Sequence, residues 1–190
     1  MVPAVQPPFE TSSQAILKPE VAKTRRTINA VVVAGNPKPA SRTADAGRRL
    51  AVAMGVDDID LIDVVTLGAG LLEWGDAGVM AAMERVRSAD LAIVASPTYK
   101  GAYTGLLKLF LDQFATGSGM QGIVAVPLML GAGPGHQMAA ELMLKPLLVE
   151  LGAIVPAPAL YQLDSGYKDD PKAVEWLERW GPIIRRFVTR

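Results

Sequence analysis

A short apolar run that passes directly into a polar loop and a helix constrains the fold of this chain most strongly. Residues 91–95 read LAIVA, and residues 96–114 follow as SPTYKGAYTGLLKLFLDQF. An apolar run of this length is typical of a strand that is buried on both faces of a parallel sheet. The loop after such a strand lies at the carboxyl edge of the sheet, where open α/β folds bind their ligands.

Further apolar runs alternate with helical patterns along the chain. Strands are predicted at residues 28–34, 56–65, 91–95, 123–130 and 153–155. Helices are predicted at residues 42–54, from Asp76, after the 96–104 loop, at residues 136–151 and from near Pro171. This alternation predicts an α/β fold, with a doubly wound five-stranded parallel sheet inside three αβα layers.

Prolines limit two segments near the carboxyl end. Residues 157–163 are expected to pair only at an edge of the sheet, because Pro156 and Pro158 lack the N–H that a ladder requires. Gly181 and Pro182 are expected to break or kink the last helix.

The composition excludes several classes of protein. With 19 basic and 19 acidic residues the net charge is zero, so nothing indicates nucleic acid or an anionic membrane as partner. The chain has no cysteine and one histidine, which excludes disulfides and makes a metal site unexpected. No stretch approaches the roughly 18 unbroken apolar residues of a membrane span. We expect a soluble, cytoplasmic protein whose partner is a small molecule.

Residues 1–27 differ in composition from the rest of the chain. They place four prolines among polar and charged residues, at Pro3, Pro7, Pro8 and Pro19. Such a segment buries too little apolar surface to offset the cost of ordering it. We expect a flexible N-terminal tail, or alternatively an arm that packs on a neighbouring subunit, followed by a single domain over residues 28–190.

Residues 35–43, the first loop, have the composition of an anion site. The loop reads GNPKPASRT and leads into a predicted helix. Its polar and basic side chains are those of Asn36, Lys38, Ser41, Arg42 and Thr43. With Ser41 as the helix cap, these groups and the N–H groups of the helix start suit a phosphomonoester. The loop lacks the pattern of a nucleoside triphosphate site, and an ordinary cap with solvated basic residues is the alternative.

Residues 96–104, the second loop, combine aromatic side chains with an accessible backbone. Pro97 fixes the turn after the strand, and Gly101 lets the backbone approach a flat ligand. Tyr99 and Tyr103 offer aromatic surface, so the loop suits a planar heterocycle. The alternative is that both tyrosines belong to the core or to an interface.

Residues 131–136, the third loop, read GAGPGH. The glycine spacing differs from the GxGxxG dinucleotide pattern, so we expect these glycines to let a planar ring lie against the backbone. His136 is expected to begin a helix. A general-base role for it is disfavoured, because no carboxylate lies near it in sequence to orient the ring.

The helix after the second loop is apolar on most sides. Its large apolar residues are Leu106, Leu107, Leu109, Phe110, Leu111 and Phe114. So wide an arc must be covered on most sides, which predicts a subunit interface in a dimer or a dihedral tetramer. The alternative is a helix that is deeply buried in a monomer.

Three segments together resemble the NADPH-dependent FMN reductase family, which has a flavodoxin-like fold. They are GNPKPASRT after the first strand, SPTYKGAYTGLLK after the third, and LGAGPGH leading to LKPLL after the fourth. The resemblance spans residues 28–155 and is closest to reductases that supply reduced flavin to a separate monooxygenase.

The resemblance implies a role for each loop. The residues matching the FMN phosphate site are Ser41, Arg42 and Thr43, with Asn36 and Lys38 where the family commonly has Ser and Arg. The isoalloxazine would be lined by Pro97, Thr98, Tyr99, Lys100 and Gly101, and its pyrimidine side by Gly131, Ala132 and Gly133. Tyr103 matches a subgroup with a π-bulge at the start of this helix, at a subunit interface associated with flavin transfer.

The implied activity is reduction of FMN, with NADPH or NADH passing hydride to flavin N5 and no acid or base required from the protein. Two other classes remain open: an FMN-retaining quinone or azo-dye reductase, and a flavodoxin-type electron carrier without enzymatic activity. Such carriers often use an acidic face to meet their partners, and the zero net charge of this chain gives no indication of one. The expected partners are flavin, nicotinamide, a monooxygenase and further copies of the chain, as a homodimer or homotetramer.

Overall fold

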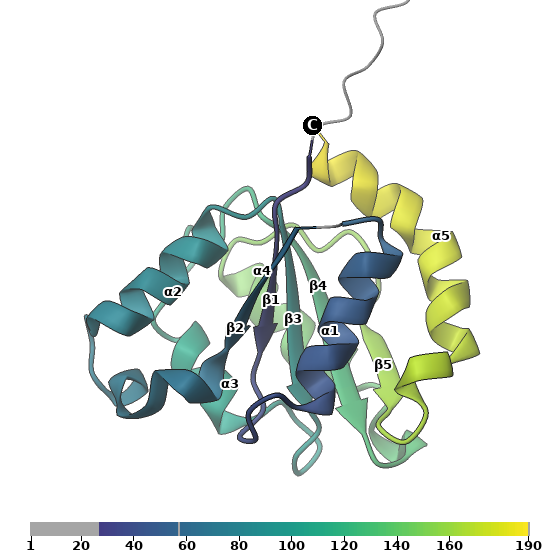
Figure 1. Cartoon of the computed structure of the whole chain (residues 1–190), viewed down its shortest axis with the longest axis horizontal. Helices are drawn as coiled ribbons and strands as arrows, with labels where there is room; N and C mark the ends of the chain where they lie inside the picture. Colours follow the sequence, from purple (N-terminus) through teal and green to yellow (C-terminus); the bar gives the residue numbers. More distant parts are fainter. Residues whose placement is uncertain (1–26, 57, 190) are drawn as a thin grey trace, which may run out of the picture.

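The computed structural model describes residues 27–56 and 58–189. They contain one sheet of five parallel strands in the order β2-β1-β3-β4-β5. The strands are β1 (Ala30–Ala34), β2 (Ile59–Asp63), β3 (Leu91–Pro97), β4 (Val124–Gly131) and β5 (Leu160–Leu163). This is the strand order of the flavodoxin-like doubly wound fold, so the predicted fold class is confirmed (Figure 1). Of the predicted tail, residues 1–26 lie outside the described part of the chain.

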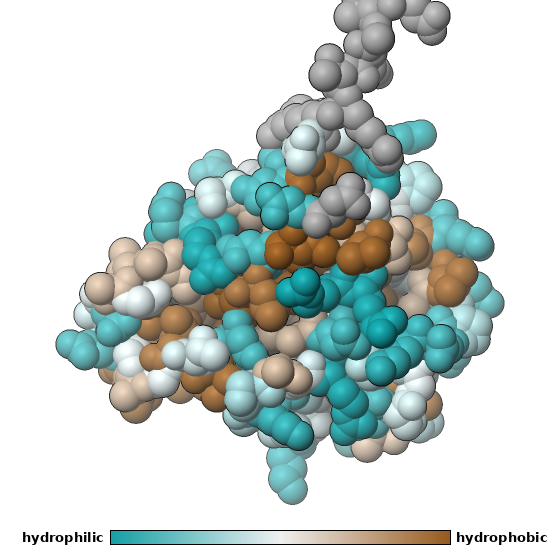
Figure 2. Space-filling view, in the orientation of Figure 1, coloured by the Kyte–Doolittle hydropathy of each residue, from teal (hydrophilic) through white to brown (hydrophobic). Residues whose placement is uncertain are grey.

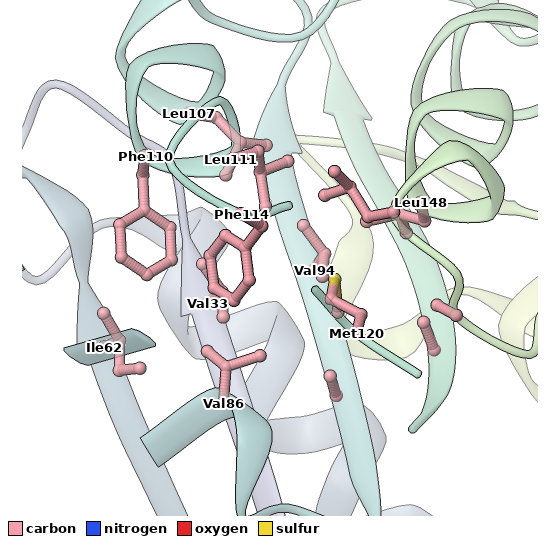
Figure 3. Close-up of a cluster of buried hydrophobic side chains, with 14 of the residues drawn as sticks. Val33, Ile62, Val86, Val94, Leu107, Phe110, Leu111, Phe114, Met120 and Leu148 are labelled. Atoms are coloured by element: carbon pink, nitrogen blue, oxygen red, sulfur yellow. The ribbon is translucent and has the colours of Figure 1, made fainter. Parts of the chain in front are cut away.

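Helices cover both faces of the sheet. The helical segments are α1 (Arg42–Ala53), η1 (Val64–Leu72), α2 (Ala77–Arg87), α3 (Gly105–Leu111), η2 (Pro134–His136), η3 (Ala140–Leu144), α4 (Lys145–Glu150), η4 (Tyr167–Asp169) and α5 (Pro171–Val188). Val32 and Ile93 face the core under α1 and α5, whereas Val33 and Val94 face the core under α2, α3 and α4. Figure 3 shows the core under α2, α3 and α4. None of the described helices is long and apolar enough to cross a membrane.

Burial along the strands follows their place in the sheet. Every residue of β1, β3 and β4 is buried, as expected for the apolar runs of central parallel strands. β2 lies at an edge, and its sequence IDLID is mostly half-buried. The carboxyl ends of the strands point to the lower end of the molecule in Figure 1, and Figure 2 shows hydrophilic side chains gathered around that end.

The prediction of a fifth strand at residues 153–155 is wrong. Ile154 forms only an isolated bridge with Val124, and β5 begins six residues later, at Leu160. Pro156 and Pro158 interrupt the ladder between these points, and regular pairing with β4 starts once residues with N–H groups follow. The predicted edge position of this segment is confirmed, because β5 is the last strand of the sheet.

The apolar arc of α3 is buried within the chain itself. Leu107, Phe110, Leu111 and Phe114 are at most 4% exposed, and only Leu109 reaches 39%. The rings of Phe110 and Phe114 meet edge to face with their centroids 5.4 Å apart (Figure 3). The chain itself therefore covers most of this arc, as the alternative of a deeply buried helix expected, and the arc gives no reason to place a subunit interface on α3. The arc is wide because this short helix is enclosed by the sheet, η1 and α2.

The helix predicted at residues 136–151 is divided into several turns, and a π-helical segment lies within it. The segment η3 is a π-helix, in which the N–H of Lys145 bonds to the carbonyl of Ala140, five residues earlier. Pro146 follows at once, and a proline ring clashes with the carbonyl four residues before it in a regular α-helix. A wider turn before Pro146 relieves this clash. The expected π-bulge beside Tyr103 is wrong, since α3 is regular and begins after that residue.

The last helix continues through Gly181 and Pro182 without a break. Pro182 is exposed, as is Glu178, whose carbonyl loses its helical N–H partner to the proline. Water can satisfy a carbonyl in this position, so α5 keeps its length and covers one face of the sheet with Ile184 and Val188.

Candidate functional site

A cavity of about 360 Å³ opens at the carboxyl ends of β1, β3 and β4, where the strand order reverses. All three loops contribute to it. It is lined by Asn36, Lys38, Ala40, Ser41, Arg42, Thr43, Pro97, Thr98, Tyr99, Leu130, Gly131, Ala132 and Asp164. Of the residues predicted to bind a cofactor, all but Lys100, Gly101 and Gly133 are in this lining. Doubly wound folds bind their ligands at such a reversal point.

The first loop is held against the N-terminus of α1 by its own side chains. The Asn36 amide donates to Thr43 Oγ1 at 3.0 Å, and Asn36 Oδ1 accepts the N–H of Lys38 at 2.9 Å. Ser41 caps α1 by accepting the N–H of Ala44 at 3.3 Å. The start of a 12-residue helix therefore opens onto the cavity, where its N–H groups and dipole favour an anion.

The second loop turns tightly at its tip. Tyr99 and Ala102 exchange backbone hydrogen bonds of 2.9 and 3.1 Å, and the two residues between them, Lys100 and Gly101, have φ of 53° and 81°. Positive φ at both central positions is typical of a type I′ turn, which favours glycine. The turn therefore accounts for Gly101, and both central residues lie beyond the lining of the cavity.

Buried hydrogen bonds join the first and second loops. The hydroxyl of Ser96 accepts the N–H of Thr104 at 3.1 Å. The hydroxyl of Thr104 donates to the carbonyl of Gly35 at 2.6 Å and accepts the N–H of Leu107 at 3.1 Å. Thr104 thus caps α3 and at the same time ties the end of β1 to the end of β3. Both loops are positioned by this one buried residue, which is 3% exposed.

The hydroxyl of Thr98 indicates a polar ligand. The N–H of Thr98 donates to the carbonyl of Leu130 at 2.6 Å, which holds the second loop against β4. The hydroxyl oxygen of Thr98 is buried at the cavity, and no described residue forms a hydrogen bond with it. A buried hydroxyl without a partner costs about 1–3 kcal/mol, so a heteroatom of a bound ligand is a suitable partner.

The third loop is supported by Tyr161 of β5. The Tyr161 hydroxyl donates to the carbonyl of Gly133 at 2.7 Å. A Cβ atom on Gly131 would lie only 2.8 Å from Cζ of Tyr161 and closer still to its hydroxyl oxygen. Packing against Tyr161 therefore requires glycine at position 131. The sequence had suggested another reason for this glycine, contact with the planar ring of a ligand. At Gly133 an added Cβ would meet nothing within 4 Å.

Two basic side chains and one carboxylate, those of Lys38, Arg42 and Asp164, give the cavity its charge. Arg42 Nη1 donates to the backbone carbonyl of Asp164 at 3.2 Å, and Nη2 lies 3.1 Å from its carboxylate. Asp164 was not predicted as a site residue, because the fifth strand was predicted at residues 153–155 and begins at Leu160. With the strand placed correctly at β5, Asp164 directly follows its carboxyl end, and a charged residue in that position would have indicated a site residue.

Tyr103 and His136 are not in the lining of the cavity. Tyr103 is half-buried and packs against the core under α2, α3 and α4, as the core alternative for this residue expected. His136 is exposed within η2, and its ring approaches Gly101 so closely that an added Cβ there would be 3.5 Å from Cδ2. The tip of the second loop therefore adjoins the third loop.

The family model for "NADPH-dependent FMN reductase" matches residues 28–168. This chain belongs to that family. Membership makes it an NAD(P)H-dependent flavin oxidoreductase, with FMN and a reduced nicotinamide as its small molecules. The predictions of the family, the enzyme class and these cofactors are confirmed.

Individual relatives agree with the family. The FMN reductase (NADPH) of Pseudomonas aeruginosa is 31% identical over 150 residues, which are 72% of this chain and 77% of that protein. The FMN reductase (NADPH) of Escherichia coli is 43% identical over 70 residues, which are 37% of this chain and only 36% of that protein. The apo crystal structure of an NADH:FMN oxidoreductase, EMOB, aligns with a TM-score of 0.72 and 27% identity over 86% of this chain and 89% of that one. The names of the two bacterial reductases specify NADPH, and the name of the solved structure specifies NADH.

Proposed function

We propose that the cavity of the three loops is the FMN site of this enzyme. The proposed phosphate contacts are Ser41, Arg42 and Thr43, with Asn36 and Lys38 beside them. The proposed ring contacts in the lining are Pro97, Thr98 and Tyr99 of the second loop and Gly131 and Ala132 of the third. Lys100, Gly101 and Gly133 are proposed as further ring contacts from outside that lining. The observation that carries the proposal is the buried hydroxyl of Thr98, which has no hydrogen-bond partner among the described residues and lines the same cavity as the N-terminus of α1.

The protein's part in the reaction is to bind and to orient. The N-terminus of α1 and the guanidinium of Arg42 fix a phosphate, and the Thr98 hydroxyl offers one directional hydrogen bond to the ring. Tyr99 is 53% exposed at the mouth of the cavity and offers an aromatic face to a second planar group such as nicotinamide. When bound, FMN supplies the acceptor for the hydride of NADPH or NADH, at ring atom N5. The protein contributes near-attack geometry and supplies no acid or base.

We also propose that reduced flavin leaves the site for a separate monooxygenase in the cytoplasm. The cavity is open to the surface, and its lining carries a single excess positive charge, which suits release better than tight retention. An enzyme that releases reduced flavin does not have to bind the compound that the flavin later reduces.

The proposal of a homodimer or homotetramer is kept, but on a different surface. Met138, Leu142, Met143 and Val149 are each 45% exposed or more, and they all lie on the segment from η2 to the end of α4. A second copy of the chain packed there would cover them. The segment begins with residues 134–136 of the third loop, whose Gly131 and Ala132 line the cavity, so such packing would adjoin the proposed flavin site.

The activity is tested by mixing the purified protein with FMN and either NADPH or NADH and following the absorbance of the reduced nicotinamide. We expect oxidation that requires added FMN. No oxidation with either nicotinamide would contradict the proposal. Retention of FMN through purification with quinone or azo-dye reduction would favour the retaining reductase, and a stable semiquinone without NADPH oxidation would favour the electron carrier.

A further inference from the structure

We infer that Asp164 competes with the flavin phosphate for Arg42 and thereby keeps the flavin exchangeable. The inference rests on the proposed FMN site and concerns a residue that the resemblance did not include. On this inference flavin is a substrate that binds and dissociates, and the carboxylate of Asp164 is the group that promotes its dissociation.

The guanidinium of Arg42 is already engaged in the structure. It donates to the backbone carbonyl of Asp164 at 3.2 Å and pairs with the carboxylate at 3.1 Å. The backbone of Asp164 is held at the end of β5, because its N–H bonds to the carbonyl of Gly131 at 2.9 Å. The Arg42 and Asp164 side chains are 62% and 33% exposed, so a ligand can reach the pair.

The charged side chains of the lining do not by themselves neutralise a phosphate. Lys38 and Arg42 contribute two positive charges and Asp164 one negative charge, which leaves one positive charge. A phosphomonoester carries about −1.5 to −2 near neutral pH. Its arrival therefore either breaks the ion pair or places two anions a few ångströms apart, and like charges at such a distance repel. Either event weakens the binding of FMN and leaves riboflavin, which has no phosphate, unaffected.

Asp164→Asn tests this with little change of shape. The asparagine keeps an oxygen and the backbone carbonyl as acceptors for Arg42, so only the charge is removed. Asp60→Asn is the matched control, because Asp60 pairs with Arg85 at β2 and α2, outside the cavity lining, and loses the same charge. We expect the Kd for FMN to fall about tenfold in Asp164→Asn and to stay unchanged in Asp60→Asn. The difference should shrink at high salt, and the Kd for riboflavin should not change.

An FMN affinity that is unchanged or weaker in Asp164→Asn would overturn the inference, as would an equal gain for riboflavin. A second measurement, the rise in melting temperature on adding inorganic phosphate, distinguishes failure of this inference from failure of the proposed FMN site. If the wild-type protein binds neither flavin, the FMN site is wrong. Even so, a larger rise in melting temperature with phosphate for Asp164→Asn than for the wild type supports the competition, and an equal rise overturns it.

Discussion

At the scale of single residues, the site depends on a few buried contacts that few other residues could make. Gly131 is one, since the ring of Tyr161 occupies the space that a Cβ would need. Gly131→Ala is expected to displace the ring or the third loop and to destabilise the fold by about 1–3 kcal/mol, the usual cost of overpacking. Urea unfolding measures this. Gly133→Ala is the control, because that position has an extended φ and open space around it; an equal loss in both variants would contradict the account.

Thr104 is another such residue. Thr104→Val keeps the shape but leaves the carbonyl of Gly35 and the N–H of Leu107 without their partner, at a site that is almost fully buried. We expect a loss of about 2 kcal/mol in the free energy of unfolding, and weaker FMN binding because the first two loops lose their common anchor. Thr66→Val removes a hydrogen bond at an exposed site and should cost less than about 1 kcal/mol. Equal costs for the two variants would show that the burial of Thr104 does not matter.

At the scale of elements, Glu141 of η3 joins the π-helical segment to the chain before β5. Its carboxylate accepts the N–H of Ala159 at 2.6 Å and pairs with Lys145 at 2.6 Å. Partial burial favours the neutral acid, but the hydrogen bonds from Lys145 and Ala159 outweigh it and hold the pKa of Glu141 below its ordinary value of 4.5.

A carboxyl with a lowered pKa contributes stability at pH above its unfolded value, and the contribution is lost as the pH falls through the folded value. The wild-type protein should therefore be more stable than Glu141→Gln at neutral pH, and the difference should shrink as the pH falls below about 4.5. Thermal unfolding between neutral and acidic pH measures this. Glu150→Gln, at an exposed position of α4, is the control. A difference that is independent of pH would contradict the role of the charge.

Most elements could be predicted from the sequence because their signals are local. Central strands appear as apolar runs, and Ser41, Asp76 and Asp170 cap their helices through their own side chains. The errors concern features that depend on the rest of the fold. Whether residues 153–155 or 160–163 pair with β4 depends on a neighbouring strand, and whether α3 is covered by its own chain depends on packing from η1 and α2.

The candidate site was predictable to a similar degree. Motifs in the three loops identified most residues of the cavity lining, since each loop follows a recognisable strand. Asp164 follows the one strand that was misplaced. The reasons for the glycines at positions 101 and 131 needed the turn geometry and the position of Tyr161, which lie beyond local sequence.

At the scale of the whole molecule, the exposed apolar side chains from η2 to α4 bear on assembly. Leu142 is 63% exposed, and Leu142→Glu is expected to shift a dimer or tetramer toward the monomer, because a carboxylate would be buried at the proposed interface. Val52→Glu on α1 is a matched control with 62% exposure on a different surface. Light scattering after gel filtration measures the mass. A monomeric wild-type protein, or an equal shift in both variants, would contradict the proposed surface.

The central claim is that the N-terminus of α1 and Arg42 hold the phosphate of FMN in the cavity between the three loops. The most direct test is the rate of NADPH or NADH oxidation as a function of FMN concentration, for the wild type, Arg42→Ala and Arg48→Ala. Arg48 is exposed on the same helix and outside this cavity. We expect the KM for FMN to rise about tenfold in Arg42→Ala, as for loss of one charge-assisted contact, and to be unchanged in Arg48→Ala. An unchanged KM in Arg42→Ala, or equal effects of the two variants, would contradict the claim.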